Sequence, residues 1–464
     1  MVRVPPDSKP EPLASRGPDR LRMAVGEARV RRARIIVISA TVAGCAAILL
    51  MSRGFNFYFD EWDFILAAPD WTLLSYLQPH NEHPSLIPKL VYGILLNTAG
   101  LRTYVPYMVV LMLLHGANVV LVFELVRRRS GEVAGMGAAA LLLFLGAGWE
   151  NLLWAFQITF VGSVACGLGA LLALELPRTR ATLSIAIALT AASLMFSGIG
   201  IALAVAVGVH LAASPERRRE VLWLVPLAAA VLIWYLVLGR SGTPSNPPPT
   251  ASNILLTPGY AVWGIGAAAA GLVGEGGWAA PVALVLGGAS IGWTWWRRRP
   301  DAFALGAAAA LVTFYLITAV SRAQFGYQQA GAGRYVYEGA VLWLLLLGDA
   351  ARSLPWRGTW RPALVAAVFL ACFNSGALLF EFAAAKSAQM QREGADLQAL
   401  DYARDTACAS APQGVDPLVM PQVTSPDLYY RAVDRYGDPA PPLPVSDFED
   451  YRRALVNLQR PPCR

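Results

Sequence analysis

Three carboxylates within four residues follow the first long apolar segment of the sequence. Asp60, Glu61 and Asp63 lie in the aromatic-rich run YFDEWDF, residues 58–64. In a helix, Asp60 and Asp63 share one face and Glu61 points elsewhere. Charged groups beside a membrane are costly unless they are solvated, paired or functional. The run is therefore a candidate site for chemistry, and the alternative is a solvated acidic turn that begins a helix.

A second polar cluster follows in the same stretch of chain and contains His80, Asn81, Glu82, His83 and Lys89. Two histidines at this spacing beside carboxylates are a possible set of ligands for a divalent cation. Pro84, however, disfavours the helical conformation that such a pair would need at His83. We therefore favour a substrate site made of hydrogen-bonding groups, with a structural polar turn as the alternative. If a cation (Mg²⁺ or Mn²⁺) binds, we expect Asp60, Asp63 and His83 to hold it.

Polar residues also mark the start of a later apolar segment, where Glu150, Asn151 and Gln157 lie. An acid such as Glu150 is common at the beginning of a helix. Gln157 falls one or two turns deeper, where a polar group needs a partner. We predict that these residues contact substrate, with simple packing as the alternative.

Another candidate segment combines arginine with glycine and glutamine. Its predicted binding residues are Arg322, Gln328, Arg334, Tyr335 and Tyr337. Arginine suits phosphate because its guanidinium donates two hydrogen bonds in a fork. Glycines nearby let the backbone approach a ligand closely. The alternative is a basic loop that contacts lipid headgroups.

Long apolar segments separate these candidate residues. Hydrophobic residues make up 56% of the 464 residues, charged residues only 15%, and the mean hydropathy is +0.46. Soluble domains have about a quarter of their residues charged. We therefore predict an all-α membrane protein, a polytopic bundle of about eleven transmembrane helices. The predicted spans are 35–52, 105–126, 132–148, 154–176, 182–198, 200–213, 220–238, 278–296, 302–320, 339–351 and 362–380.

Arginine clusters predict how the helices are oriented. The net charge of +7 comes mainly from arginines in short segments between apolar runs, which indicates membrane topology and no nucleic-acid partner. If residues 1–34 form a cytoplasmic basic arm, counting the apolar run Tyr260–Val273 as a further span would place the arginines 297–299 outside the cytoplasm. We therefore expect this run to be a re-entrant or interfacial helix. The remaining clusters then also lie on the cytoplasmic side: 127–129, 178–180, 217–219, 297–299 and 352–361.

Three regions follow from this topology. Residues 1–34 are the arm, residues 35–380 are the transmembrane domain with a first outward loop at 53–104, and residues 381–464 are an extracytoplasmic C-terminal tail. We expect a multi-pass protein of the plasma (inner) membrane. A disulfide between Cys408 and Cys463 is consistent with a tail outside the cytoplasm.

The pattern resembles the GT-C superfamily of membrane glycosyltransferases. Asp60-Glu61 after Tyr58-Phe59 is similar to the Asp-Glu pair of protein O-mannosyltransferases, and Arg334-Tyr335 resembles the Arg-Tyr motif of polyprenyl-phosphate-dependent members. The resemblance covers residues 35–380 and leaves the tail unexplained. It implies an inverting transfer of a sugar from a polyprenyl-phosphate donor to an envelope glycan, lipid or protein acceptor on the extracytoplasmic face. Some relatives use a divalent metal at the acidic loop, and others do not.

The roles of the residues follow from that reaction. A general base must deprotonate the acceptor hydroxyl, and we expect Asp60 first, then Asp63, with Glu61 as a further catalytic candidate. The phosphate leaves as an anion, so it needs positive charge. We expect that charge from Arg334, then Arg322, then Lys89. The residues expected to orient the hydroxyls of the sugar or acceptor are His80, Glu82 and His83, and the lipid tail would lie between membrane helices.

Three other functions fit parts of the pattern. A transporter or flippase for lipid-linked envelope intermediates would have charges or broken helices near the middle of the membrane. A non-catalytic membrane scaffold would tolerate replacement of the acidic run. An oligosaccharide ligase of related layout would transfer a glycan instead of one sugar.

Overall fold

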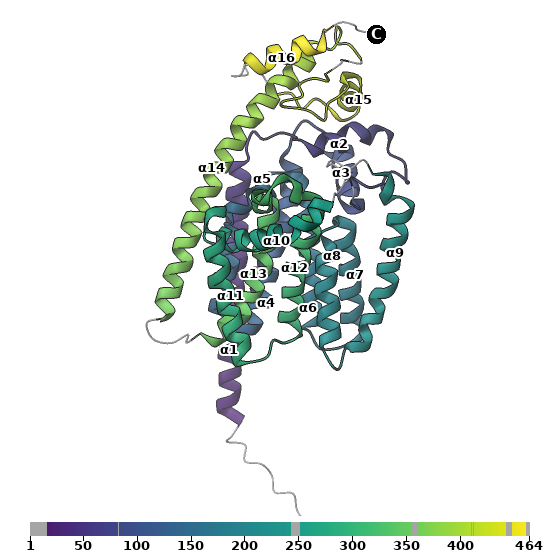
Figure 1. Cartoon of the computed structure of the whole chain (residues 1–464). Helices are drawn as coiled ribbons and strands as arrows, with labels where there is room; N and C mark the ends of the chain where they lie inside the picture. Colours follow the sequence, from purple (N-terminus) through teal and green to yellow (C-terminus); the bar gives the residue numbers. More distant parts are fainter. Residues whose placement is uncertain are drawn as a thin grey trace, which may run out of the picture.

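A computed structural model describes residues 16–81, 83–242, 251–354, 360–409, 411, 413–441 and 448–460. Its regular elements within these ranges are all helices, so the prediction of an all-helical protein is confirmed. The membrane part consists of helices α1 Arg16–Met51, α2 Asp60–Ala67, α3 Leu86–Thr98, α4 Val105–Leu143, α5 Trp149–Leu153, α6 Ile158–Leu174, α7 Arg180–Phe196, α8 Gly200–Ala213, α9 Leu224–Val237, α10 Ala251–Gly271, α11 Ala280–Arg297, α12 Ala302–Arg322, α13 Gly333–Ala350 and α14 Trp360–Tyr402. Helices α15 Pro426–Tyr436 and α16 Phe448–Leu458 follow (Figure 1).

Seven of the described helices are long and apolar enough to cross a membrane. They are Gly26–Met51, Val105–Leu143, Ala155–Leu174, Arg218–Ser241, Ala251–Gly271, Ala302–Phe325 and Trp360–Tyr402. Large apolar side chains cover the outside of the bundle, with Leu113, Val237 and Phe369 each about 70% exposed (69%, 70% and 69%). Such a surface requires an apolar solvent, which a lipid bilayer supplies.

Helix α4 is a hairpin and contains two of the predicted spans. At Gly131 the backbone leaves the helical region, with φ 86° and ψ 175°. His115 Nε2 lies 3.4 Å from the carbonyl oxygen of Leu143. In a straight helix two such residues would be about 42 Å apart, so the chain turns back at Gly131.

Two predicted segments differ from the structure. The stretch 53–104, predicted as a loop, contains helices α2 and α3. Helix α10 begins well before Tyr260 and is 21 residues long. Helix α10 packs on α12 and α13. Asn253 on α10 donates to the carbonyl of Val320 near the end of α12, and Gly264 lies against Tyr315 of the same helix.

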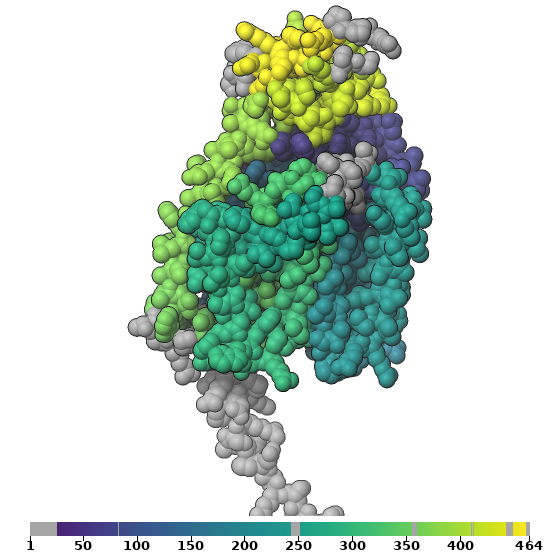
Figure 2. Space-filling model, viewed as in Figure 1, coloured from purple at the N-terminus to yellow at the C-terminus, as the bar shows by residue number. Residues whose placement is uncertain are grey.

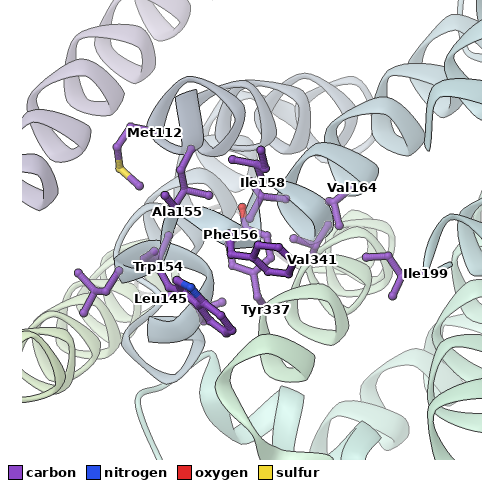
Figure 3. Close-up of a cluster of buried hydrophobic side chains, with 14 of the residues drawn as sticks. Met112, Leu145, Trp154, Ala155, Phe156, Ile158, Val164, Ile199, Tyr337 and Val341 are labelled. Atoms are coloured by element: carbon purple, nitrogen blue, oxygen red, sulfur yellow. The ribbon is translucent and has the colours of Figure 1, made fainter. Parts of the chain in front are cut away.

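Close contact between helices builds the core of the bundle. Helix α6 packs on α7 and α8, where Gly162 faces the ring of Phe196 and Gly167 faces Leu203. A Cβ atom at Gly162 would lie 2.4 Å from that ring, so only glycine allows this approach. Figure 3 shows the aromatic centre of the core, where Phe156 and Tyr337 lie among aliphatic side chains.

The predicted arginine-rich segments meet at one end of the bundle. Arg129 forms ion pairs with Glu175, Asp301 and Asp349, and Arg352 pairs with the latter two. These contacts join four segments that are far apart in the sequence. They therefore lie on one side of the bundle, as the charge pattern predicts.

The opposite end of the bundle carries a small cap built from the end of α14, α15 and α16 (Figures 1 and 2). Helix α14 has 43 residues, which at 1.5 Å per residue is about 65 Å and roughly twice the thickness of a membrane core. Its second half therefore extends into the cap. Cys408 is disulfide-bonded, and its predicted partner, Cys463, lies outside the described residues.

The cap rests on the chain around α2. The ring of Tyr429 lies 5.8 Å from that of Trp62, and both side chains are buried. Arg431 pairs with Asp70 at 3.2 Å, and Arg435 donates to the carbonyl of Pro69 at 2.8 Å. Helix α2 is thus packed between the cap and the membrane helices.

Candidate functional site

A polar cavity of about 270 Å³ lies below α2, where the ends of several membrane helices on the side of the cap meet. Residues from five separate parts of the chain line it: Phe59, Asp60, His80, Asn81, His83, Ser85, Phe156, Gln157, Thr159, Phe160, Ser197, Arg322, Gln329, Arg334 and Tyr335. The structure therefore brings together Asp60, both histidines and both arginines predicted from the sequence.

Unusual backbone geometry directs two of these residues into the cavity. Phe59 and Asn81 are the only non-glycine residues with positive φ in the part of the chain that the structure describes, at 50° and 52°. Each such conformation costs about 1–3 kcal/mol and persists only where the surroundings enforce it. Phe59 starts α2 at Asp60, and Asn81 separates the two histidines. Backbone strain thus coincides with the cavity.

Asp60 begins α2 and lines the cavity together with Arg322 and Arg334. Burial raises the pKa of Asp60 to about 6, while the positive charges of Arg334 and Arg322 oppose that rise. Its carboxyl group is therefore mostly ionised at neutral pH and can still accept a proton. This combination is what a general base requires.

The possible cation ligands differ from the predicted set by one histidine. Ligand atoms of Asp60, Asp63 and His80 lie within 4.8 Å of one another, so the prediction of His83 is corrected to His80. The ring of His80 packs edge-on against Phe64 and Phe156, at 5.1 and 5.3 Å, which holds it beside α2. His83 lies instead against Gly198. Burial, with the charges of Lys89 and His83, lowers the pKa of His80 to about 4, so its ring is neutral, as a ligand must be.

Glu61 is a structural residue and does not line the cavity. Its carboxylate accepts hydrogen bonds from the hydroxyls of Tyr92 and Tyr104 and from the backbone N–H of Tyr58. The side chain is completely buried, and burial raises its pKa to about 7. The prediction of a catalytic Glu61 is therefore wrong in position. Because it is one residue after Asp60 on a helix, its side chain is rotated by about 100° around the helix axis and points into the interior.

Glu150 contacts Arg334. Its Oε2 atom accepts the backbone N–H of Arg334 at 2.9 Å and lies 3.9 Å from Nε of the same residue. Arg322 Nε donates to the hydroxyl of Tyr335 at 2.8 Å. Glu150 thus positions Arg334 at the cavity wall and does not line the cavity, contrary to the prediction of direct substrate contact.

Four other predicted binding residues lie outside the cavity. Lys89 donates to the carbonyls of Ser75 and Gln78 and so ties down the preceding turn. Tyr337 is buried in the core, where its hydroxyl contacts His115 and Asn118. The two remaining members are the buried Asn151 and the exposed Gln328.

These four residues were predicted from their positions along the chain, and such positions do not show where a side chain points in the folded protein. Gln328 lies in the turn Tyr327–Gly331, and its neighbour Gln329 lines the cavity in its place. Glu82, also predicted to bind substrate, lies outside the described residues.

Several lining residues were not predicted: Ser85, Phe156, Thr159, Phe160, Ser197 and Gln329. Only Ser197 had a detectable signal, because it lies in the Ser-Gly-Ile-Gly break between two apolar runs. Breaks of this kind in a membrane helix often lie beside a binding site. The other residues belong to ordinary apolar or polar stretches.

An apolar groove of about 600 Å³ continues from the cavity. The two spaces share His83, Phe160, Arg322 and Tyr335. Helices α8, α9 and α12 form its walls, and α9 has no buried residue of its own. The indole N–H of Trp234 on α9 donates to the carbonyl of Leu77 at 2.8 Å, which links this outer wall to the turn before His80.

Comparisons with protein-family models, curated proteins and solved structures give no significant match to this chain.

Proposed function

We propose that this protein is a membrane glycosyltransferase that moves a sugar from a polyprenyl-phosphate donor to a hydroxyl acceptor. One observation supports this most strongly: a polar cavity with a carboxylate and two arginines continues directly into an apolar groove between membrane helices. A lipid-linked sugar has the same division into a polar, anionic head and a long apolar tail. No water-soluble donor would need the groove.

In this proposal Asp60 is the general base. It takes the proton of the acceptor hydroxyl while the oxygen attacks the anomeric carbon of the sugar. The bond from that carbon to the phosphate oxygen breaks, and its electron pair leaves with the phosphate. Attack opposite the leaving group inverts the anomeric centre. Asp63, exposed beside Asp60, is a second candidate for proton transfer.

Arg322 and Arg334 would stabilise the departing phosphate. Both line the same cavity as Asp60, and Arg322 also lines the groove. Charge placed in advance where negative charge develops is an efficient source of catalysis in a site shielded from water. His80, His83, Asn81 and Gln157 would then orient the hydroxyls of the sugar or acceptor.

A divalent cation fits the group formed by Asp60, Asp63 and His80, which offers two oxygens and a neutral imidazole. When bound, such a cation would supply positive charge near the phosphate. If Asp60 is a ligand, Asp63 would be the better base. Removal of metal with a chelator, followed by addition of Mg²⁺ or Mn²⁺, decides between these arrangements. Activity that persists in the chelator assigns proton transfer to Asp60 with no cation, whereas loss and recovery assigns the group as ligands.

We further propose that the site faces the extracytoplasmic side of the plasma (inner) membrane, with the acceptor entering between cap and bundle. The acceptor is then an envelope glycan, lipid or protein. This orientation rests on the arginine segments at the other end of the bundle. Accessibility of a cysteine introduced at exposed Asp70 to a membrane-impermeant thiol reagent tests it in intact cells; protection there would reverse the orientation.

Replacement of Asp60 by Asn tests the central role. Full-length protein in proteoliposomes is given radiolabelled polyprenyl-phosphate hexoses and pentoses, and transfer to membrane acceptors is measured. Loss of a general base typically costs about 10²- to 10⁴-fold, so D60N should be slower by that factor. Because the pKa of Asp60 is about 6, wild-type activity should also fall as the pH decreases through that value and the carboxylate is protonated.

The matched control is Asp70→Asn, which removes a carboxylate from the same stretch but outside the cavity. It should retain activity and the same pH profile. Full activity in a correctly inserted D60N would refute the assignment of the base. If the wild type transfers none of the sugars, a glycosyltransferase function for these donors is excluded.

A further inference from the structure

A second apolar groove lies at the end of the bundle opposite the candidate site. It has a volume of about 570 Å³ and lies between the second half of α4, α13 and the beginning of α14. Val133, Met136, Leu347, Val368 and Phe369 are among the side chains that line it. No charged side chain lies in the groove among the described residues. A groove of this kind accepts hydrocarbon chains.

A polar pocket of about 580 Å³ adjoins the groove. Val133 and Met136 line both spaces, so the two are continuous. Arg29 and Arg32 from α1 and Arg361 from α14 converge on this pocket. A single carboxylate, that of Glu132, lines it among the described residues, so positive charge is in excess.

Two other arginines at this end of the bundle are engaged in ion pairs. Neighbouring Arg34 pairs with Glu124 at 2.6 Å, and Arg352 pairs with Asp349 at 3.0 Å. No ion pair of Arg29, Arg32 or Arg361 with a carboxylate is found among the described residues. All three side chains are exposed, so their charges are available to a ligand.

We propose that the groove and pocket together bind an anionic phospholipid from the leaflet opposite the cap. The acyl chains lie in the groove, and the three arginines bind the phosphate of the headgroup. Arginine forms charge-assisted, forked hydrogen bonds to phosphate, and basic pockets between membrane helices are suited to anionic headgroups. The site is separate from the candidate cavity, so the proposal does not depend on the catalytic function. Its consequence is a lipid that contacts α1, α4, α13 and α14 together at this end of the bundle.

Native mass spectrometry of the purified full chain tests the proposal, with phosphatidylglycerol and phosphatidylcholine of the same acyl chains as probes. The wild type should bind phosphatidylglycerol at least about tenfold more tightly, because phosphatidylglycerol is a net anion, whereas the choline cation of phosphatidylcholine offsets its phosphate and is repelled by the three arginines. The variant R29Q/R32Q/R361Q should lose this preference. A matched control, R218Q/R219Q/R299Q, removes the same charge from exposed positions at the same end outside the pocket and should keep it.

A second variant tests the groove without changing any charge. A Cβ atom at Gly137 would lie 3.6 Å from Val368, an ordinary contact, so Gly137→Phe can place its ring in the groove. It should weaken phosphatidylglycerol binding about as much as the triple variant. Thermal unfolding in detergent checks that each variant is folded, and R361Q alone replaces the triple variant if that one is not.

Three results would overturn the proposal. The wild type shows no preference for the anionic lipid, or both triple variants lose the preference equally, which indicates only general surface charge. Alternatively, G137F retains full lipid binding while inorganic phosphate displaces the lipid, which indicates an anion site without a place for acyl chains.

Discussion

At the scale of single residues, the candidate site depends on how neighbours along the chain point apart. Asp60 faces the cavity, whereas Glu61, the next residue, is held in the interior by Tyr92 and Tyr104. Those two hydroxyls fix the helix from its buried side and thereby direct Asp60 to the other. The strained backbone of Phe59 completes this arrangement. One carboxylate of the pair therefore lines the cavity, and the other is buried among tyrosine hydroxyls.

Arg334 is expected to bind the donor phosphate, which makes Arg334→Ala a test at this scale. Loss of a charge-assisted hydrogen bond costs about 1.5–3 kcal/mol, so donor affinity should fall about 10- to 100-fold. The measurement is the KM for the lipid-linked donor at saturating acceptor. Exposed Arg240, which lies outside the cavity, provides the matched control R240A. Equal donor affinity in R334A and wild type would exclude the predicted role.

At the scale of helices, α9 stands apart from the bundle. None of its residues is buried, and its inner face lines the apolar groove. The bond from Trp234 to the carbonyl of Leu77 connects it to the turn that carries the histidines. A wall of this kind would enclose the proposed lipid chain on one side and leave the groove open to the membrane. The position of α9 is therefore expected to affect long donors most.

A bulky side chain on the inner face of α9 tests that expectation. Val231 lines the groove, so Val231→Trp should raise the KM for long polyprenyl donors about tenfold or more, because overfilling a packed space costs about 1–3 kcal/mol. Short-chain donors should be affected little. On the same helix, Val225 is 59% exposed and outside the groove, and V225W is the control. If V231W weakens short and long donors alike, the groove does not hold the lipid tail.

At the scale of the whole molecule, the cap joins the C-terminal part of the chain to the segment around α2. Buried packing carries this contact, because Tyr429 is 1% exposed and lies against Trp62. In the ion pair between Arg431 and Asp70, both side chains are exposed to solvent. Exposed ion pairs contribute about 0–1 kcal/mol, whereas a buried aromatic side chain contributes several times more. The apolar contact should therefore dominate.

Two substitutions in the cap separate these contributions. Tyr429→Ala should lower the free energy of unfolding by about 3–5 kcal/mol, as for other large aromatic truncations, and should reduce transfer by loosening α2. Arg431→Ala should change it by no more than about 1 kcal/mol. Thermal unfolding of the purified protein measures the change in stability, and the transfer assay measures the change in activity. A larger effect from R431A would show that charge, and not packing, holds the cap.

Local patterns accounted for much of the fold. The apolar runs predicted most of the helices, because hydropathy reflects the solvent that each segment meets. The kink that divides α4 agrees with two predicted spans, since a glycine and a charged segment separate the two apolar runs. Helices α2 and α3 were missed because short helices in a polar stretch carry no long apolar period. The full length of α10 was missed because this run was excluded from the predicted spans to keep the arginine segments on one side of the membrane.

The sequence by itself determined that this is a helical membrane protein and that Asp60, His80, His83, Arg322 and Arg334 are chemically suited to a site. It could do so because residue type, hydropathy and helical spacing are local properties. Only the tertiary structure decided that these residues share one cavity, that His80 replaces His83 beside the acids, and that Glu61, Lys89 and Tyr337 serve the framework. Such distinctions depend on packing between segments far apart in the chain, and no local pattern records which neighbour fills a given space.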